Sequence, residues 1–210
     1  MSGRGRPLVR IAGLLLVLAA AGVLAAKLLP GDRDEPLPVI AEIPEFRLIE
    51  ASGRPVTRAD LAGKPWVADL IFTSCSGICP AMTQEMSRLA KHTADVPDLR
   101  LVSITVDPAR DTPEKLTEYA ARFGADRSRW LFLTGDDAVI RKLAREGLLL
   151  PVAEGDPSQG DEAILHSPRF ALIDGRGRVR GSYDMRDAEA MLRLRGDVRR
   201  LVEEPSAASG

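Results

Sequence analysis

Two cysteines, four positions apart, carry the most distinctive chemistry in this chain. Cys75 and Cys79 follow the apolar run 66–72, and Pro80 comes directly after them. The run predicts a buried strand and the proline suits a first helical turn, so both thiols are expected at a helix amino terminus. Unpaired amide N–H groups and the helix dipole favour thiolate there. We therefore expect both cysteines to be unusually acidic and able to bind a soft metal ion.

A distant histidine is the candidate for a third metal ligand. His166 is one of only two histidines, and it follows the polar loop expected from Glu154 to Glu162. Two thiolates and one imidazole suit copper, because sulfur selects Cu(I) and nitrogen keeps Cu(II) accessible. The pattern predicts one copper ion bound by Cys75, Cys79 and His166 if the chain folds the imidazole back to the thiols.

The remaining polar and sulfur-containing candidates have simpler interpretations. His92 lies on the polar side of an expected helix and is interpreted as solvated. Met82 and Met86 recur at helical spacing, which indicates core packing more than thioether ligation. Asp107 and Asp111 stand at a strand end and beside a helix start, where aspartate commonly forms turns and caps.

Strands and helices alternate along the rest of the chain. Thr112 before Pro113 is typical of a capped helix start, and Gly124 ends that helix. This alternation, closed by a hairpin and a final helix, predicts an α/β fold with a central mixed β-sheet flanked by helices in three layers. The expected strands are 46–50, 56–57, 66–72, 99–106, 130–133, 148–152, 168–174 and 178–183, and the expected helices are 81–91, 113–123, 138–145 and 187–202.

The amino terminus resembles a membrane anchor. Three arginines precede the apolar run 11–26, acidic residues follow it, and the stretch 8–29 has 22 residues, enough to span a bilayer. We expect a single-pass transmembrane helix within 1–29 that places the remainder in the periplasm or another extracytoplasmic space. A cleaved signal peptide is the alternative interpretation.

The rest of the chain divides into a tether, one domain and a tail. Prolines and acidic residues predict a tether at 30–41, the folded domain is expected at 42–203, and 204–210 reads as a disordered tail. The 29 basic and 30 acidic residues nearly cancel, which argues against nucleic acid as a partner. Two cysteines are too few for a disulfide-stapled scaffold.

Several motifs together resemble the Sco/SenC family over residues 42–203. They are the Cys-x-x-x-Cys-Pro segment after a strand, the run Val106–Pro113, the segment Trp130–Gly135 and the late histidine. The resemblance implies a thioredoxin-like fold, copper held by Cys75, Cys79 and His166, and delivery toward the dinuclear copper centre of cytochrome c oxidase or another periplasmic acceptor. It does not imply catalysis.

Two departures from the family pattern concern the predicted site. Leu165 stands where the family commonly has an acidic residue, so a partner that orients His166 is expected to be missing. Ser76 and Gly77 replace the frequent Pro-Asp.

Two other functions remain open. The thiol pair alone would suffice for a thiol-disulfide oxidoreductase or a redox sensor, for which His166 is dispensable. A structural zinc site would need a fourth ligand that the sequence does not obviously supply.

Overall fold

The computed structural model of this chain describes residues 35–154 and 164–204. The chain divides into two compact units, of which the second begins at Leu37 and contains the described fold. The predicted anchor, the first five residues of the predicted tether and most of the predicted tail lie outside the described residues. Within them, no helix is both long and apolar enough to cross a membrane.

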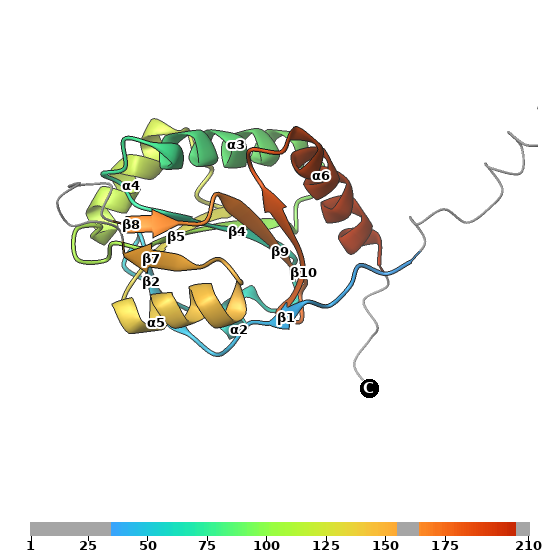
Figure 1. Ribbon diagram of the computed structural model, residues 1–210, viewed down its shortest axis with the longest axis horizontal. Helices are drawn as coiled ribbons and strands as arrows, with labels where there is room; N and C mark the ends of the chain where they lie inside the picture. The colour runs from blue at the N-terminus through green and yellow to red at the C-terminus, as the bar shows by residue number, and fades with distance from the viewer. Residues whose placement is uncertain (1–34, 155–163, 205–210) are drawn as a thin grey trace, which may run out of the picture. The chain divides into compact units, whose positions relative to one another are not determined.

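Ten strands and six helical segments make up the described chain (Figure 1). The strands are β1 (Ala41–Glu42), β2 (Arg47–Glu50), β3 (Pro55–Thr57), β4 (Trp66–Ile71), β5 (Arg100–Thr105), β6 (Trp130–Thr134), β7 (Val152–Glu154), β8 (Ile164–His166), β9 (Arg169–Ile173) and β10 (Arg178–Asp184). The helical segments are α2 (Arg58–Leu61), α3 (Ile78–His92), α4 (Pro113–Arg122), α5 (Asp137–Lys142), the π-helical turn η1 (Leu143–Gly147) and α6 (Ala188–Glu203).

The central sheet is mixed, as predicted. Its eight strands lie in the order β1-β10-β9-β4-β5-β6-β2-β3, and β7 and β8 form a separate two-stranded ladder. β4, β5 and β6 are parallel neighbours, whereas the other pairs in the sheet are antiparallel. All six residues of β4 are buried, which explains its continuous apolar character and places it at the centre of the fold.

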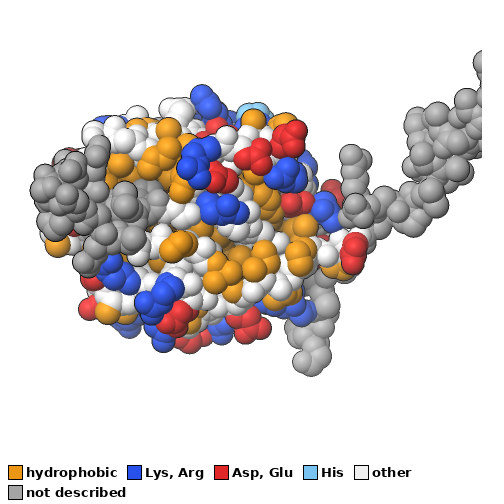
Figure 2. Space-filling model, viewed as in Figure 1, with side chains coloured by type: hydrophobic (Ala, Val, Ile, Leu, Met, Phe, Trp, Pro, Cys, Tyr) orange, Lys and Arg blue, Asp and Glu red, His pale blue; other side chains and the backbone are white. Residues whose placement is uncertain are grey.

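Helices cover both faces of the sheet, which confirms the three-layer expectation. Figure 1 shows α3, α4 and α6 on one side and α2 and α5 on the other. Each side has its own apolar core, and Met82 and Met86 are fully buried in the first of them. Their core interpretation is confirmed. Figure 2 shows basic and acidic side chains interspersed over the face drawn, in keeping with a net charge of -1.

The strand predicted at 148–152 is wrong for most of its length. Backbone N–H groups of Leu148 and Leu150 donate to the carbonyls of Leu143 and Ala144, both at 2.8 Å, so these residues cap η1, which ends at Gly147, instead of pairing in a strand. Leu149, between them, adopts a left-handed conformation with φ 56°, which turns the chain at the end of the helical segment. Apolar runs this short do not distinguish strand from helix by pattern alone, and β7 begins only at Val152.

The folded unit starts earlier than residue 42, because a strap of seven residues, 37–43, runs along β10. Leu37 is 7% exposed, and Ile40 and Ile43 donate backbone hydrogen bonds to Val179 and Gly177, both at 2.8 Å. Arg180 fastens the start of the strap.

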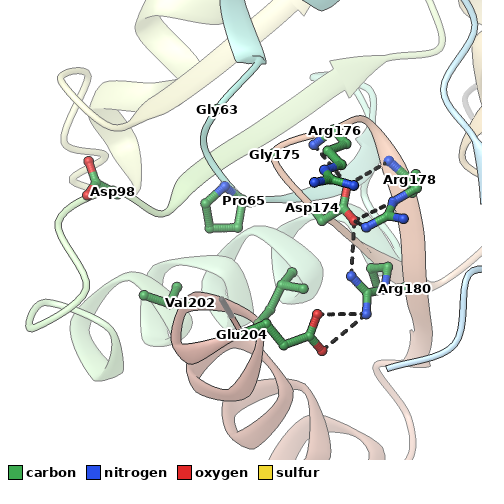
Figure 3. Close-up of a pocket in the computed structure, with 11 residues that line it drawn as sticks. Gly63, Pro65, Asp98, Asp174, Gly175, Arg176, Arg178, Arg180, Val202 and Glu204 are labelled. Carbon is green, nitrogen blue, oxygen red and sulfur yellow. Dashed lines mark hydrogen bonds and ion pairs between the residues drawn. The ribbon is translucent and has the colours of Figure 1, made fainter. Parts of the chain in front are cut away.

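Arg180 is a buried arginine, 4% exposed, that joins the strap to the end of α6 (Figure 3). Its guanidinium donates to the Leu37 carbonyl and pairs with Asp174 at 3.0 Å and Glu204 at 2.8 Å. Glu204 in turn accepts from the Leu37 N–H at 2.9 Å. Asp174, Arg180 and Glu204 also line a cavity of about 300 Å³. The cavity lies at the amino ends of β4 and β5, the end of the sheet opposite the cysteines.

A second buried charge, Asp69, lies in the middle of β4. It is 0% exposed, and neither carboxylate oxygen has a hydrogen-bond partner among the described residues. Burial raises the pKa of Asp69 to about 7, and the neighbouring Ser103 hydroxyl offsets only part of that rise. Asp69 therefore makes the stability of the fold dependent on pH.

We expect Asp69→Asn to flatten the pH dependence of stability. The folded protein holds the Asp69 proton more tightly than the unfolded chain does, so the free energy of unfolding falls as pH rises from about 4 to 7 and levels off above that. Between pH 5 and 8 the parent should lose about 2–3 kcal/mol more than the variant, measured by urea unfolding. Parallel pH profiles for the two proteins would contradict this assignment.

We expect Arg180→Ala to destabilise the domain by about 3 kcal/mol, because it leaves two carboxylates and one carbonyl without their shared cation. The variant should also be cleaved faster by protease between residues 37 and 43. Arg186→Ala is the matched control, since Arg186 pairs with Asp184 but its side chain is 68% exposed. Equal losses in the two variants would show that the buried position of Arg180 has no special role.

Candidate metal centre

Cys75 and Cys79 lie where β4 ends and α3 begins. Residues 72–77 connect the two elements, and α3 starts at Ile78, three residues earlier than its apolar pattern indicates. Cys79 is therefore in the first turn and is 0% exposed, whereas Cys75 precedes the helix and is partly exposed. The predicted placement of both thiols near a helix start is confirmed.

The two thiols interact directly and are not joined in a disulfide. Burial is the main cause that raises the pKa of Cys79, and a hydrogen bond with Cys75 and the nearby charge of Asp69 add to the rise. The expectation that the helix start makes this thiol acidic is thus wrong for metal-free Cys79, because desolvation outweighs the helix dipole. A soft cation bound to the sulfur would displace the proton outright.

The helix holds Cys79 through its backbone and through the residues of the next turn. The Thr83 hydroxyl donates to the Cys79 carbonyl at 2.9 Å and lies 2.7 Å from the Tyr119 hydroxyl on α4. Thr83 is fully buried and Tyr119 nearly so. These contacts hold the first turn of α3, which carries Cys79, against α4.

Asp111 holds the segment that carries Cys75. It is 0% exposed, and its carboxylate accepts from the Thr73 N–H at 3.0 Å, the Thr73 hydroxyl at 2.5 Å and the Thr105 hydroxyl at 2.5 Å. Sequence reasoning assigned Asp111 a turn or cap role and missed this contact. Thr112 is the actual cap of α4, accepting from the Lys115 N–H at 3.4 Å. Only long-range pairing brings Asp111 to Thr73, so local pattern carries no signal for it.

Asp107 contacts Thr105 and Asp111 through its backbone, whereas His92 lies at the opposite end of α3 from Cys79. Asp107 pairs with Arg110 at the surface of the loop after β5 and donates its backbone N–H to the Thr105 hydroxyl at 3.0 Å. His92 is exposed at the far end of α3, where its Nδ1 atom lies 2.7 Å from the Arg88 carbonyl oxygen. The interpretation of His92 as a surface residue is confirmed.

The backbone of His166 belongs to β8, an element that the sequence did not reveal. His166 is level with Val152 at the base of the β7–β8 ladder, and Ser167 donates to the Pro151 carbonyl at 3.2 Å. The histidine therefore follows directly from a paired strand and leads into β9. The ring of His166 and the side chain of Leu165 lie outside the described part of the chain.

The sheet brings the backbone of His166 to the edge where the cysteines lie. β9 runs antiparallel to β4, with Ala171 level with Ala68. β9 begins three residues after His166, so the chain enters β9 at the end of the sheet where β4 stops and the cysteines follow. Among the side chains that the structure describes, no three His, Cys, Asp or Glu residues come together. The thiol pair is therefore the part of the predicted copper site whose geometry the structure describes.

The described geometry supports two kinds of chemistry. Adjacent thiols can be oxidised to a disulfide, or they can lose their protons and bind a soft cation. One sulfur is shielded and the other reaches solvent, so an incoming ion or partner would meet Cys75 first. The next two residues, Ser76 and Gly77, are small and exposed.

Comparison with known proteins gives consistent matches. The family model SCO1/SenC matches residues 36–203. The SCO1 protein homolog of Bacillus subtilis is 33% identical over 149 residues, which cover 70% of this chain and 76% of that protein.

Two solved structures extend the match to three dimensions. BsSco, described as a member of the Sco family of cytochrome c oxidase assembly proteins with a disulfide switch, has a TM-score of 0.69 and 30% identity over 81% of this chain and 97% of its own. ScoI of Bradyrhizobium japonicum, solved with copper bound, has a TM-score of 0.64 and 26% identity over 77% of this chain and 99% of its own. The sequence resemblance is thereby confirmed, and the chain belongs to the SCO1/SenC family.

Proposed function

We propose that this protein is an extracytoplasmic copper metallochaperone that binds one copper ion through Cys75, Cys79 and His166. The observation that carries the proposal is the pair of interacting thiols, not joined in a disulfide, at the end of β4, the same end of the sheet at which β9 begins three residues after His166. Copper in the solved ScoI structure supports the choice of metal. Sulfur and imidazole ligands suit copper in both oxidation states.

The proposed receiver is the copper-centre subunit of cytochrome c oxidase, as the printed role of BsSco suggests, or another copper acceptor outside the cytoplasm. A single-pass anchor within residues 1–29 would keep the domain at the cytoplasmic membrane, facing the periplasm or its equivalent. Transfer requires no change in oxidation state, because an acceptor ligand can replace each donor ligand in turn. Cys75, which is partly exposed, would exchange first, and the shielded Cys79 last.

Anaerobic Cu(I) titration of the reduced full chain tests the proposal. We expect one copper per chain, loss of tight binding in Cys75→Ser and Cys79→Ser, and at least about tenfold weaker binding in His166→Ala, since each removes one ligand. His92→Ala is the matched control because His92 is the only other histidine and is exposed. Equal copper affinities of His166→Ala and His92→Ala would remove His166 from the site.

A thiol-disulfide oxidoreductase or redox sensor is the second candidate, favoured by the direct interaction of the two thiols and by the disulfide switch attributed to BsSco. This function needs both cysteines but no imidazole. If it is the main activity, His166→Ala should reduce a disulfide substrate at the parent rate while each cysteine variant fails. A rate that falls with His166→Ala as far as copper affinity does would count against it.

A further inference from the structure

We propose that Asp111 is the positioning residue that holds Cys75 in place opposite Cys79, and that it acts through Thr73. Its bonds to the Thr73 N–H and hydroxyl join the loop after β5 to the segment between β4 and α3. The inference deepens the proposed function, because the position of Cys75 determines how well the thiol pair accepts copper. Its effect on the thiol pair itself can be measured without any metal.

Cys75 needs such a support and Cys79 does not. Cys79 is part of α3 and fully buried, so the helix and its packing determine its position. Cys75 lies outside both elements, in the segment 73–77, where the Ser74 hydroxyl has no partner among the described residues. The Cys75 N–H donates to the Phe72 carbonyl at 3.2 Å, a bond within the same connection.

The bonds from Thr73 to Asp111 tie the start of segment 73–77 to the loop that follows β5. Hydrogen bonds to a carboxylate are stronger than those between neutral groups. The carboxylate is also fully buried, so water does not compete for its lone pairs. Asp111 can therefore restrain Thr73, and with it the cysteine two residues later.

The support is itself rigid. The Asp111 N–H donates to the Asp107 carbonyl at 2.9 Å, and the Thr105 hydroxyl at the end of β5 donates to the Asp111 carboxylate. The next residue, Thr112, caps α4. Asp111 is thus held by β5 and by the start of α4. Its remaining bonds, to Thr73, can therefore restrain the cysteine segment.

The position of Cys75 affects both reactions of the thiol pair. In a disulfide the two sulfur atoms are about 2 Å apart and the dihedral angles are narrowly restricted. Two sulfur atoms that bind one metal ion lie farther apart than that. A displacement of Cys75 by a fraction of an ångström therefore changes the balance between dithiol, disulfide and metal-bound forms. A residue that only stabilised the fold would not shift that balance.

Two isosteric variants separate positioning from stability. Thr73→Val removes the hydroxyl bond between Asp111 and the cysteine segment, and Thr93→Val removes a buried hydroxyl bond to the Leu89 carbonyl at the far end of α3. In the full chain, we expect Thr73→Val to weaken Cu(I) binding, measured by chelator competition, about tenfold, as loss of one hydrogen bond to a charged group would. It should also change the equilibrium of the Cys75–Cys79 disulfide with glutathione about fivefold or more, from the same displacement.

Thr93→Val should leave both quantities within about twofold of the parent even where urea unfolding shows a similar loss of stability. The inference is overturned if both threonine variants shift copper affinity and the glutathione equilibrium alike, or if Thr73→Val shifts neither. Combining Asp111→Asn with Thr73→Val gives a further check. Both changes act on the contact between Asp111 and Thr73, so their effects on copper affinity should not multiply.

The two proposals can fail separately. If neither the parent nor any variant binds copper, the metallochaperone proposal fails, and the glutathione equilibrium still tests Asp111. If copper binding is intact but unaffected by Thr73→Val, the positioning role of Asp111 fails alone.

Discussion

The parallel pairing of β4 with β5 is the constraint on which the candidate centre depends. Its register sets Ile71 level with Thr105, so the two strands end together. The connections that follow them then leave the sheet side by side, and Asp111 can accept from Thr73 on one and from Thr105 on the other. A slip of two residues in this pairing would keep every side chain on its own face and still separate these groups.

Three buried charged side chains show how differently this fold treats a charge. Arg180 is surrounded by the acids and the carbonyl that it joins, so it fastens the start of the folded unit to its last helix. Asp111 is surrounded by hydroxyl and amide donors and stabilises a connection. Asp69 has no such partner among the described residues, and burial raises its pKa to about 7. Asp69 therefore makes the core sensitive to pH near neutrality.

The same contrast explains the thiol pair. A helix start should favour thiolate, yet Cys79 is packed between the sheet and α3 and keeps its proton more tightly than a free cysteine. Burial outweighs the dipole because desolvation acts on the whole side chain, whereas the dipole effect is confined to the first turn. In this environment the metal-free Cys79 thiol keeps its proton, and a soft cation bound to its sulfur would displace that proton.

The sequence by itself determined the α/β class, the order of most elements, the membership of the core and the thiols at the end of a buried strand. Those features depend on local periodicity and on residue types such as the apolar run of β4 and the cap before α4. It did not reveal β8 or the bonds of Arg180 to the strap, and it misjudged the path of residues 148–151 and the role of Asp111. The tertiary structure decided these. Arg180 and Asp111 meet their partners, tens of residues away, only when strands pair and helices pack, and β8 forms only by pairing with β7. The path of residues 148–151 depends on capping bonds that a short apolar run does not reveal. Propensity and spacing describe neighbours along the chain, whereas burial and partnership are determined by neighbours in space.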